Sequence, residues 1–203
     1  MTRPLLLFAH GAGLGSSSPW MTRWAALLAP LGDVVTFDYP YMAAGRKRPD
    51  RHPVLLEAHR EALEAALASR GQHQAILIGK SMGSRIGCHL AVEAPERVSA
   101  LVCLGYPLVS SGRTRKVRDE VLLALSRPIL FVQGTRDRLC PLDALEAVRP
   151  RMAAPSERFV VEGGDHSLHL RKRDLAERGL TQEAADQEAV AAIGRFLAGG
   201  HAT

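Results

Sequence analysis

Residues 74–83 read QAILIGKSMG, and this stretch decides the predicted fold. Its first part, residues 74–79, is a short and continuously apolar run, which is typical of a parallel strand buried on both faces. Its second part fits the pattern G-x-S-x-G, and a helix is predicted directly behind it over residues 82–94. So sharp a turn between a strand and a helix forces Ser81 into a strained backbone conformation and projects its hydroxyl from the sheet. The stretch therefore predicts a parallel sheet with an exposed serine at the end of one strand.

Around this stretch, short apolar runs alternate with helical patterns along the chain. The predicted strands are residues 4–9, 33–38, 74–79, 98–104, 128–133 and 158–162. The predicted helices are residues 20–31, 54–70, 82–94, 118–125, 142–152 and 181–197. Strands that are separated by helices pair in parallel, and right-handed crossovers then cover both faces of the sheet. We therefore expect an α/β fold with a doubly wound, mostly parallel, six-stranded sheet, formed by residues 1–203 as a single domain.

Length and composition limit the class of protein. The chain has 203 residues, of which 46% are hydrophobic and 23% charged, as expected for one globular domain with its own core. It lacks the run of about 18 apolar residues that a membrane-spanning helix needs, and its apolar stretch at residues 5–9 is too short for a secretory signal. The three cysteines have no close pair, which argues against a disulfide framework and a zinc site. We expect a cytoplasmic protein without a metal ion.

The net charge of +5 is weak evidence for a nucleic-acid partner. Basic residues form local runs at positions 46–48, 113–118 and 171–173, but aromatic residues make up only 5% of the chain and none flank these runs. Nucleic-acid-binding proteins usually combine such runs with aromatic residues or a recognisable module. We therefore interpret the runs as solvated loops and helix faces, and expect neither a nucleic acid nor a membrane as a partner.

Two further polar residues follow predicted strands and complete a catalytic pattern. A hydroxyl is a poor nucleophile without a base, so Ser81 needs a histidine that a carboxylate holds in place. Asp137 follows the fifth predicted strand in GTRDRLCP, and His166 follows the sixth in GGDHS. Because the carboxyl ends of parallel strands lie at one edge of a sheet, we expect these three side chains to meet there. They are the candidates for nucleophile, acid and base.

Other acidic and histidine residues near the strand ends suit these roles less well. Asp165 adjoins His166 and is interpreted as a turn residue. Asp38 ends the second strand, which is expected at an edge of the sheet far from Ser81. His169 is the nearest alternative base, but it lies beyond the loop that carries the candidate histidine.

Two backbone N–H groups near the hydroxyl are needed to stabilise an oxyanion. The amide of Met82 is one candidate because it follows the nucleophile at a helix N-terminus. The glycine-rich loop HGAG at residues 10–13 supplies the other, with Ala12 as the first candidate and Gly13 as the alternative. We expect the dipeptide His10-Gly11 to orient this loop.

Two glycine motifs suggest other functions. Residues 79–81, GKS, are similar to the tail of a phosphate-binding P-loop, but Gln74 stands within a strand where that loop needs a glycine. Residues 11–16, GAGLGS, are similar to a dinucleotide fingerprint with Asp38 as the ribose partner, but Ser16 replaces the third glycine. The dinucleotide hypothesis also leaves the candidate triad unexplained. We therefore expect no cofactor.

The motifs HGAG, GKSMGSR, VSALVCLGYPL, PILFVQGTRDRLCP and GGDHSL together resemble the small dienelactone-hydrolase-like branch of the α/β-hydrolases. The likeness extends from His10 to about His169. Within that branch, the motifs resemble more specifically the group that includes the NSL complex subunit 3 and testis-expressed hydrolase-like proteins. The resemblance implies a serine hydrolase with Ser81, Asp137 and His166 as its triad. It implies no particular substrate. Some relatives are chromatin-complex subunits, so a non-catalytic interaction module on the same fold is the alternative.

The short segment after the fourth predicted strand determines how open the site is. Residues 106–126 have room for a loop and one short helix rather than a cap, so we expect a minimal, lidless fold with an open pocket. The candidate substrate contacts are Gly13, Trp20, Tyr106 and Leu108. Basic residues of the following loop are candidates for attracting an acidic acyl group, namely Arg113, Arg115, Lys116 and Arg118. Whether Lys80 faces the pocket is left open.

The expected reaction is the hydrolysis of a small-molecule ester or thioester. Ser81 attacks the carbonyl carbon, and the resulting acyl-enzyme is cleaved by water that His166 activates. Hydrogen peroxide in place of water is an alternative acceptor on the same fold.

Overall fold

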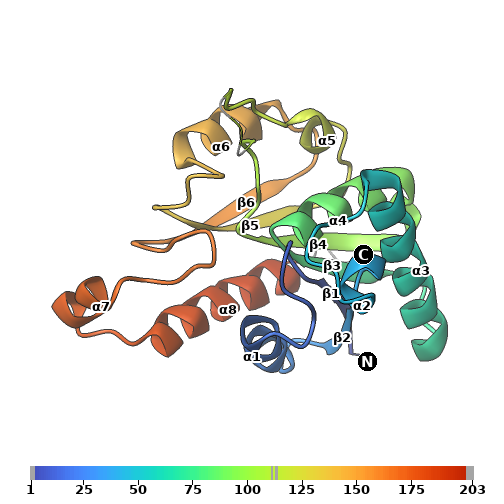
Figure 1. Cartoon of the computed structure of the whole chain (residues 1–203), viewed down its shortest axis with the longest axis horizontal. Helices are drawn as coiled ribbons and strands as arrows, with labels where there is room; N and C mark the ends of the chain where they lie inside the picture. The colour runs from blue at the N-terminus through green and yellow to red at the C-terminus, as the bar shows by residue number, and fades with distance from the viewer. Residues whose placement is uncertain (1–2, 111, 113, 200–203) are drawn as a thin grey trace.

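Six parallel strands form one sheet in the computed structural model, which describes residues 3–110, 112 and 114–199 (Figure 1). The strands are β1 (Leu5–Ala9), β2 (Asp33–Phe37), β3 (Ala75–Lys80), β4 (Val98–Leu104), β5 (Ile129–Gly134) and β6 (Ser156–Val161). Their order across the sheet is β2-β1-β3-β4-β5-β6, and each neighbouring pair is parallel. The predicted α/β sheet is confirmed, and it is wholly rather than mostly parallel.

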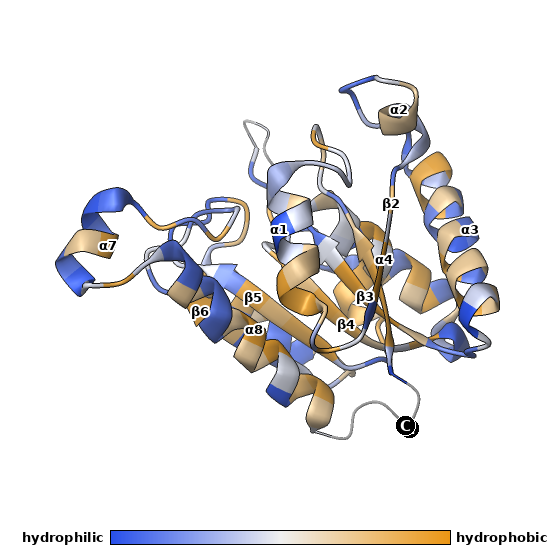
Figure 2. Ribbon diagram, turned by 90° about the horizontal axis from the view of Figure 1, so that it is seen from below, coloured by the Kyte–Doolittle hydropathy of each residue, from blue (hydrophilic) through white to orange (hydrophobic). Residues whose placement is uncertain are grey.

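Helices cover both faces of this sheet (Figures 1 and 2). The helices are α1 (Pro19–Leu28), α2 (Pro40–Ala43), α3 (His52–Arg70), α4 (Met82–Glu93), α5 (Glu120–Leu123), α6 (Leu142–Val148), α7 (Lys172–Arg178) and α8 (Gln182–Ala198), with 3-10 turns η1 (Pro95–Arg97) and η2 (Arg149–Arg151). Helices α1 and α8 lie on one face, and α3 and α4 lie on the other (Figure 1). The sheet is therefore doubly wound, as predicted.

Two hydrophobic clusters hold these layers together, one on each face of the sheet. Side chains alternate along β1, so that Leu5 and Leu7 join the cluster under α3 and α4, whereas Leu6 and Phe8 join the cluster under α1 and α8. All four are at most 1% exposed. A strand that is buried on both faces must be apolar at every position, which explains the continuous apolar runs of the sequence.

Prolines cause two of the differences between the predicted and observed helices. The helix predicted over residues 20–31 ends at Leu28, because Pro30 lacks the N–H group that would continue the helical hydrogen bonds. The helix predicted over residues 142–152 is divided at Pro150 into α6 and η2 for the same reason. Two short helices, α2 and α7, were not predicted.

The connection from β4 to β5 carries a single short helix, α5, within the part of it that the structure describes. No cap therefore covers the carboxyl ends of the strands there, in agreement with the predicted lidless fold. Among the described residues, no helix is both long and apolar enough to cross a membrane.

Candidate active site

Ser81 occupies the sharp turn between β3 and α4. Its φ of 50° and ψ of −111° lie outside the regions that L-residues normally adopt, as expected for a strained nucleophile turn. The motif needs glycine at positions 79 and 83 because backbone atoms of neighbouring residues occupy the space of a side chain there. A Cβ atom at Gly79 would lie 2.1 Å from the Ser84 nitrogen, and one at Gly83 would lie 2.5 Å from the Ala9 oxygen. The turn therefore presents the Ser81 hydroxyl only because both flanking positions lack side chains.

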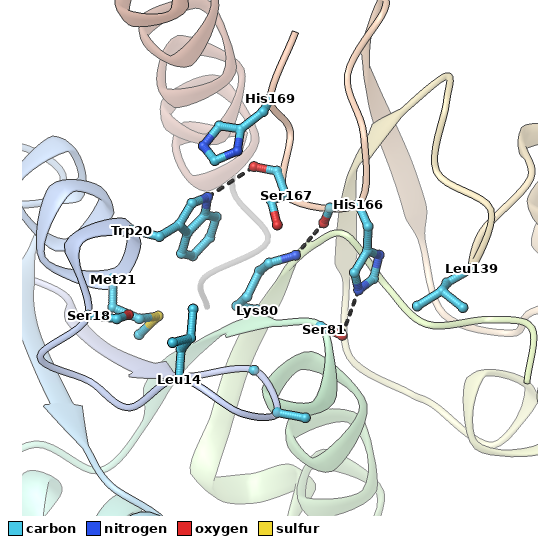
Figure 3. Close-up of a pocket in the computed structure, with 12 residues that line it drawn as sticks. Leu14, Ser18, Trp20, Met21, Lys80, Ser81, Leu139, His166, Ser167 and His169 are labelled. Atoms are coloured by element: carbon cyan, nitrogen blue, oxygen red, sulfur yellow. Dashed lines mark hydrogen bonds between the residues drawn. The ribbon is translucent and has the colours of Figure 1, made fainter. Parts of the chain in front are cut away.

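The hydroxyl of Ser81 is linked through His166 to Asp137. The Nε2 atom of His166 lies 2.7 Å from the Ser81 oxygen (Figure 3), and its Nδ1 atom lies 2.8 Å from Oδ2 of Asp137. Asp137 lies beyond the end of β5, and its side chain is fully buried, whereas the His166 side chain is 27% exposed. The structure thus brings together the three residues that the sequence suggested as nucleophile, base and acid.

The carboxylate of Asp137 is fixed by two further donors. The side-chain amide of Gln133 donates to Oδ2 at 2.5 Å, and the Leu139 amide donates to Oδ1 at 2.8 Å. The Gln133 carbonyl oxygen in turn accepts from the Tyr106 amide. Gln133 was not among the predicted site residues, although a polar residue within the buried, apolar strand β5 is a signal of such a role.

Lys80, the neighbour of the nucleophile, does face the pocket (Figure 3). Its side chain is buried, its ammonium donates to the backbone oxygen of His166, and Nζ lies 5.4 Å from the centre of the Trp20 ring. Burial lowers the pKa of Lys80 to about 8, an effect that the charges of Asp137 and Asp165 oppose. The loop between β6 and α7 carries His166, and we call it the histidine loop. The buried ammonium of Lys80 therefore holds this loop against β3.

Trp20 makes a parallel contact to the same loop. Its Nε1 atom donates to the backbone oxygen of Ser167 at 3.0 Å, so that two consecutive carbonyl groups of the loop are bound by side chains of different elements (Figure 3). This double attachment fixes the backbone that carries His166. Trp20 also lines the pocket, as the sequence suggested.

The two predicted oxyanion donors both belong to segments that adjoin the nucleophile. Met82 is the first residue of α4, and Ala12 lines the same pocket as Ser81. Neither amide donates to a protein acceptor within the described residues, so both are free to bind an oxyanion. Gly11 holds the loop close to the nucleophile, since a Cβ atom at that position would lie 3.5 Å from Cβ of Ser81.

The loop that carries Ala12 is held by His10 and Asp38. Nδ1 of the buried His10 lies 2.7 Å from the Gly11 oxygen, and Nε2 accepts from the Tyr39 amide at 3.1 Å, which assigns the proton to Nδ1. Burial lowers the pKa of His10, in keeping with a neutral ring. Asp38 accepts from the Ser16 amide at 2.6 Å. Asp38 is therefore part of the loop support rather than of the triad.

A pocket of about 390 Å³ opens beside the Ser81 hydroxyl. It is lined by Gly11, Ala12, Leu14, Ser18, Trp20, Met21, Lys80, Ser81, Leu139, His166, Ser167 and His169. None of these side chains is acidic, and the ammonium of Lys80 is the cationic group that borders it. Among the described residues, no three His, Cys, Asp or Glu side chains lie together as a metal site would require.

Three of the predicted substrate contacts do not line this pocket. Tyr106 and Leu108 are fully buried in the core, and the Tyr106 ring packs 5.7 Å from that of Phe131. The prediction for these two is wrong because Gly105, with a φ of +69°, redirects the chain after β4 and takes both side chains into the core. Gly13 is also absent from the lining, where its neighbour Leu14 is present instead.

The other candidates have structural roles. Asp165 accepts from the Ser167 and His169 amides, which confirms its interpretation as a turn residue. His169 lines the pocket at an exposed position but takes no part in the chain of hydrogen bonds. Of the basic loop residues, Arg118 donates to the Pro107 oxygen and Lys116 is exposed, and neither lines the pocket; Arg113 lies outside the described residues.

Comparison with known proteins agrees with this architecture. Residues 2–198 match the family described as alpha/beta hydrolase domain. The chain is 28% identical over 188 residues to "Putative carbamate hydrolase RutD" of Klebsiella pneumoniae, a match that covers 90% of this chain and 68% of that protein.

Solved structures are also similar to this one, among them the following two. An alpha-beta serine hydrolase homologue from Coxiella burnetii gives a TM-score of 0.67 at 24% identity, with 89% of each chain covered. A dienelactone hydrolase from Anabaena variabilis gives a TM-score of 0.67 at 20% identity, covering 90% of this chain and 85% of that one. These likenesses support the fold, and the family match spans nearly the whole sequence. The chain therefore belongs to the alpha/beta hydrolase domain family.

Proposed function

We propose that this protein is a serine hydrolase that cleaves an ester or thioester of a small acyl substrate. The observation that carries the proposal is the chain of hydrogen bonds from Ser81 through His166 to Asp137, which ends at a pocket. An imidazole that is held at Nδ1 by a buried carboxylate presents its Nε2 lone pair to the hydroxyl, and this is the arrangement that activates a serine. We further infer that residues 1–203 act as a single domain.

The reaction proceeds in two halves. In the first half, the Ser81 oxygen attacks the carbonyl carbon while His166 takes the hydroxyl proton, and the amides of Ala12 and Met82 stabilise the oxyanion. Collapse of the tetrahedral intermediate releases the alcohol or thiol, which receives the proton from His166 and leaves an acyl-enzyme. In the second half, His166 takes a proton from water as the water attacks the acyl group, and returns that proton to Ser81 as the acid is released.

The shape of the pocket favours a short acyl group. Its volume of about 390 Å³ is at the small end of ligand sites, and Leu14, Trp20 and Met21 give it apolar walls. These features suit a small molecule that carries an acyl chain of a few carbons. The lining does not select for a charged acyl group.

A carbamate is a second candidate substrate, and the likeness to the Klebsiella protein favours it. A carbamate carbonyl carbon is attacked by the same nucleophile, and its tetrahedral intermediate makes the same demands on the Ala12 and Met82 amides. The narrower likeness to NSL complex subunit 3 and testis-expressed hydrolase-like proteins remains a prediction, and with it the alternative of a non-catalytic interaction module.

Labelling with a fluorophosphonate probe tests the proposal directly. We expect the full chain to be labelled at Ser81 and to hydrolyse p-nitrophenyl esters, with a preference for acetate and butyrate over long chains. Ser81→Ala is expected to abolish both, whereas Ser69→Ala, on the outer part of α3, is expected to change neither. A panel that includes an N-alkyl carbamate ester distinguishes the two substrate classes. Absence of labelling in a folded protein refutes the proposal and favours the interaction module.

A further inference from the structure

A second concavity lies beside the candidate active site, and arginine side chains dominate it. It has a volume of about 650 Å³. Its lining consists of Arg115, Thr135, Arg136, Asp137, Arg138, Pro141, Leu142, Asp143 and Arg171. We call this concavity the arginine groove. Four arginine residues from three separate segments of the chain therefore border one hollow.

The positive charge of the arginine groove is mostly uncompensated. Within the described residues, the guanidinium groups of Arg138 and Arg171 have no hydrogen-bond or ion-pair partner. Arg115 donates to the backbone oxygen of Arg138, a contact that orients its guanidinium without cancelling its charge. Arg136 is the exception, because it lies 3.5 Å from the Asp174 carboxylate. Three cationic side chains thus remain for an external anion.

The acidic residues of the lining do not neutralise these cations. The Asp137 side chain is fully buried and is bound to His166, so the groove is bordered by the backbone of Asp137 rather than by its carboxylate. The Asp143 carboxylate is exposed and is the remaining acid of the lining. Cations that are gathered in a hollow raise its potential and attract anions, and the guanidinium fork matches the oxygens of a phosphate. Because the cations of the arginine groove outnumber its one exposed carboxylate, the groove suits an anion that carries two or more negative charges.

The arginine groove lies on the side of the triad where a leaving group departs. Its wall is formed by Asp137 and Arg138, and the next residue, Leu139, lines the catalytic pocket. Figure 3 shows Leu139 on the opposite side of His166 from Trp20. Since His166 delivers the proton to the leaving group, that group must lie on the His166 side of Ser81. The acyl chain then occupies the apolar part around Trp20.

We propose that the arginine groove binds phosphate groups that the leaving alcohol or thiol of the substrate carries. This inference rests on the proposed function, and it names the substrate class as an acyl ester or thioester of a phosphorylated carrier. The ligand spans two adjoining cavities, with its acyl group beside Ser81 and its phosphates against Arg138 and Arg171. The reaction itself is unchanged, because the phosphates only hold the substrate.

A binding experiment tests the arginine groove without any need for catalysis. Inorganic pyrophosphate is titrated calorimetrically into the whole 203-residue chain with the change Ser81→Ala. The double change Arg138→Ala and Arg171→Ala is expected to weaken the binding of pyrophosphate at least tenfold. The control is Lys47→Ala with Arg48→Ala, which removes the same charge from an exposed loop far from the site and is expected to leave the binding constant within twofold. Equal weakening by both pairs, or weakening by neither, overturns the proposal.

A kinetic experiment tests the substrate class. Acetyl-coenzyme A carries a phosphorylated leaving thiol, whereas S-acetyl-N-acetylcysteamine presents the same thioester on a short neutral thiol. We expect kcat/KM to be at least tenfold higher for the phosphorylated thioester, and this ratio to fall toward one in the groove variant but not in the loop control. A ratio near one in the unmodified protein overturns the proposal. If neither thioester nor p-nitrophenyl acetate is hydrolysed, the proposed function is wrong. The pyrophosphate titration then still tests whether the arginine groove binds phosphate groups.

Discussion

Replacing Lys80 by methionine is expected to stabilise the protein and to slow it. The ammonium of Lys80 is buried against Trp20, and the backbone oxygen of His166 is its hydrogen-bond acceptor. Methionine fills a similar volume without a charge. A buried ion that is replaced by an apolar side chain of similar size often leaves a protein more stable, while the function that needed the ion is lost.

The magnitude of the stability change follows from the pKa. Burial lowers the pKa of Lys80 from 10.5 to about 8, which corresponds to roughly 3 kcal/mol spent in keeping the group charged below pH 8. Loss of the hydrogen bond to His166 offsets about 1 kcal/mol of this gain. The free energy of unfolding of Lys80→Met at pH 7 is therefore expected to exceed that of the unmodified chain by about 2 kcal/mol, or about 4–8 °C in Tm.

This difference must depend on pH with a definite sign. Between pH 8 and pH 10.5 the unfolded chain keeps the Lys80 proton that the folded chain has released, so the unmodified protein gains stability as pH rises. The difference in the free energy of unfolding between Lys80→Met and the unmodified protein is therefore largest below pH 8 and disappears by about pH 10.5. The exposed residue Lys172 provides the matched control, since Lys172→Met removes a charge without relieving burial.

Two measurements check the reasoning. Urea unfolding at pH 7 and pH 10 gives the two free energies, and stopped-flow hydrolysis of p-nitrophenyl acetate gives kcat. We expect kcat of Lys80→Met to fall by about fivefold, because the histidine loop loses a hydrogen bond worth about 1 kcal/mol. A variant that is less stable at pH 7 refutes the burial argument. A variant with unchanged kcat refutes the role of Lys80 in holding His166.

Three further changes probe the supports of the triad. Asp137→Asn is expected to lower kcat by about 10⁴-fold with little change in KM, because the amide no longer holds the productive tautomer of the histidine, and the rate of fluorophosphonate labelling measures this. Gln133→Leu removes one of the two donors to Oδ2 of Asp137 and leaves the buried Tyr106 amide without a partner, so unfolding in urea should show a loss of about 1–3 kcal/mol, with kcat reduced about tenfold. Gly105→Ala places a Cβ atom 2.4 Å from the His166 oxygen at a φ of +69°, and we expect a lower Tm together with slower labelling; retention of both contradicts the close packing.

The strands and the triad were accessible from sequence because their signals are local. The four inner strands are apolar at nearly every position, and the boundaries of all six strands were predicted to within two residues. Ser81, Asp137 and His166 each lie shortly after the carboxyl end of a strand, and the rule that sites lie at the carboxyl ends of parallel strands is then sufficient to bring them together.

The parts that were missed depend on where the chain turns after a strand. Tyr106 and Leu108 follow β4 as closely as Asp137 follows β5, yet one glycine with a positive φ takes them into the core. The burial of Lys80 was also inaccessible, since a strand residue points to one face or the other according to a register that only the sheet defines. Helices α2 and α7 are too short to show the apolar periodicity that would reveal them in the sequence.

Glycines at the ends of the central strands explain how side chains so distant in sequence meet. Strand β4 lies between β3, which carries the nucleophile, and β5, which precedes the acid, so the histidine loop must cross the end of β4 to reach Ser81. It crosses against Gly105, where even a methyl group would overlap the His166 oxygen. The same loop passes Gly134 at the end of β5, where a Cβ atom would lie 2.2 Å from the Gly164 oxygen. The loop can therefore lie directly on the edge of the sheet, within reach of Lys80, and this contact rather than the triad alone sets the distance between base and nucleophile.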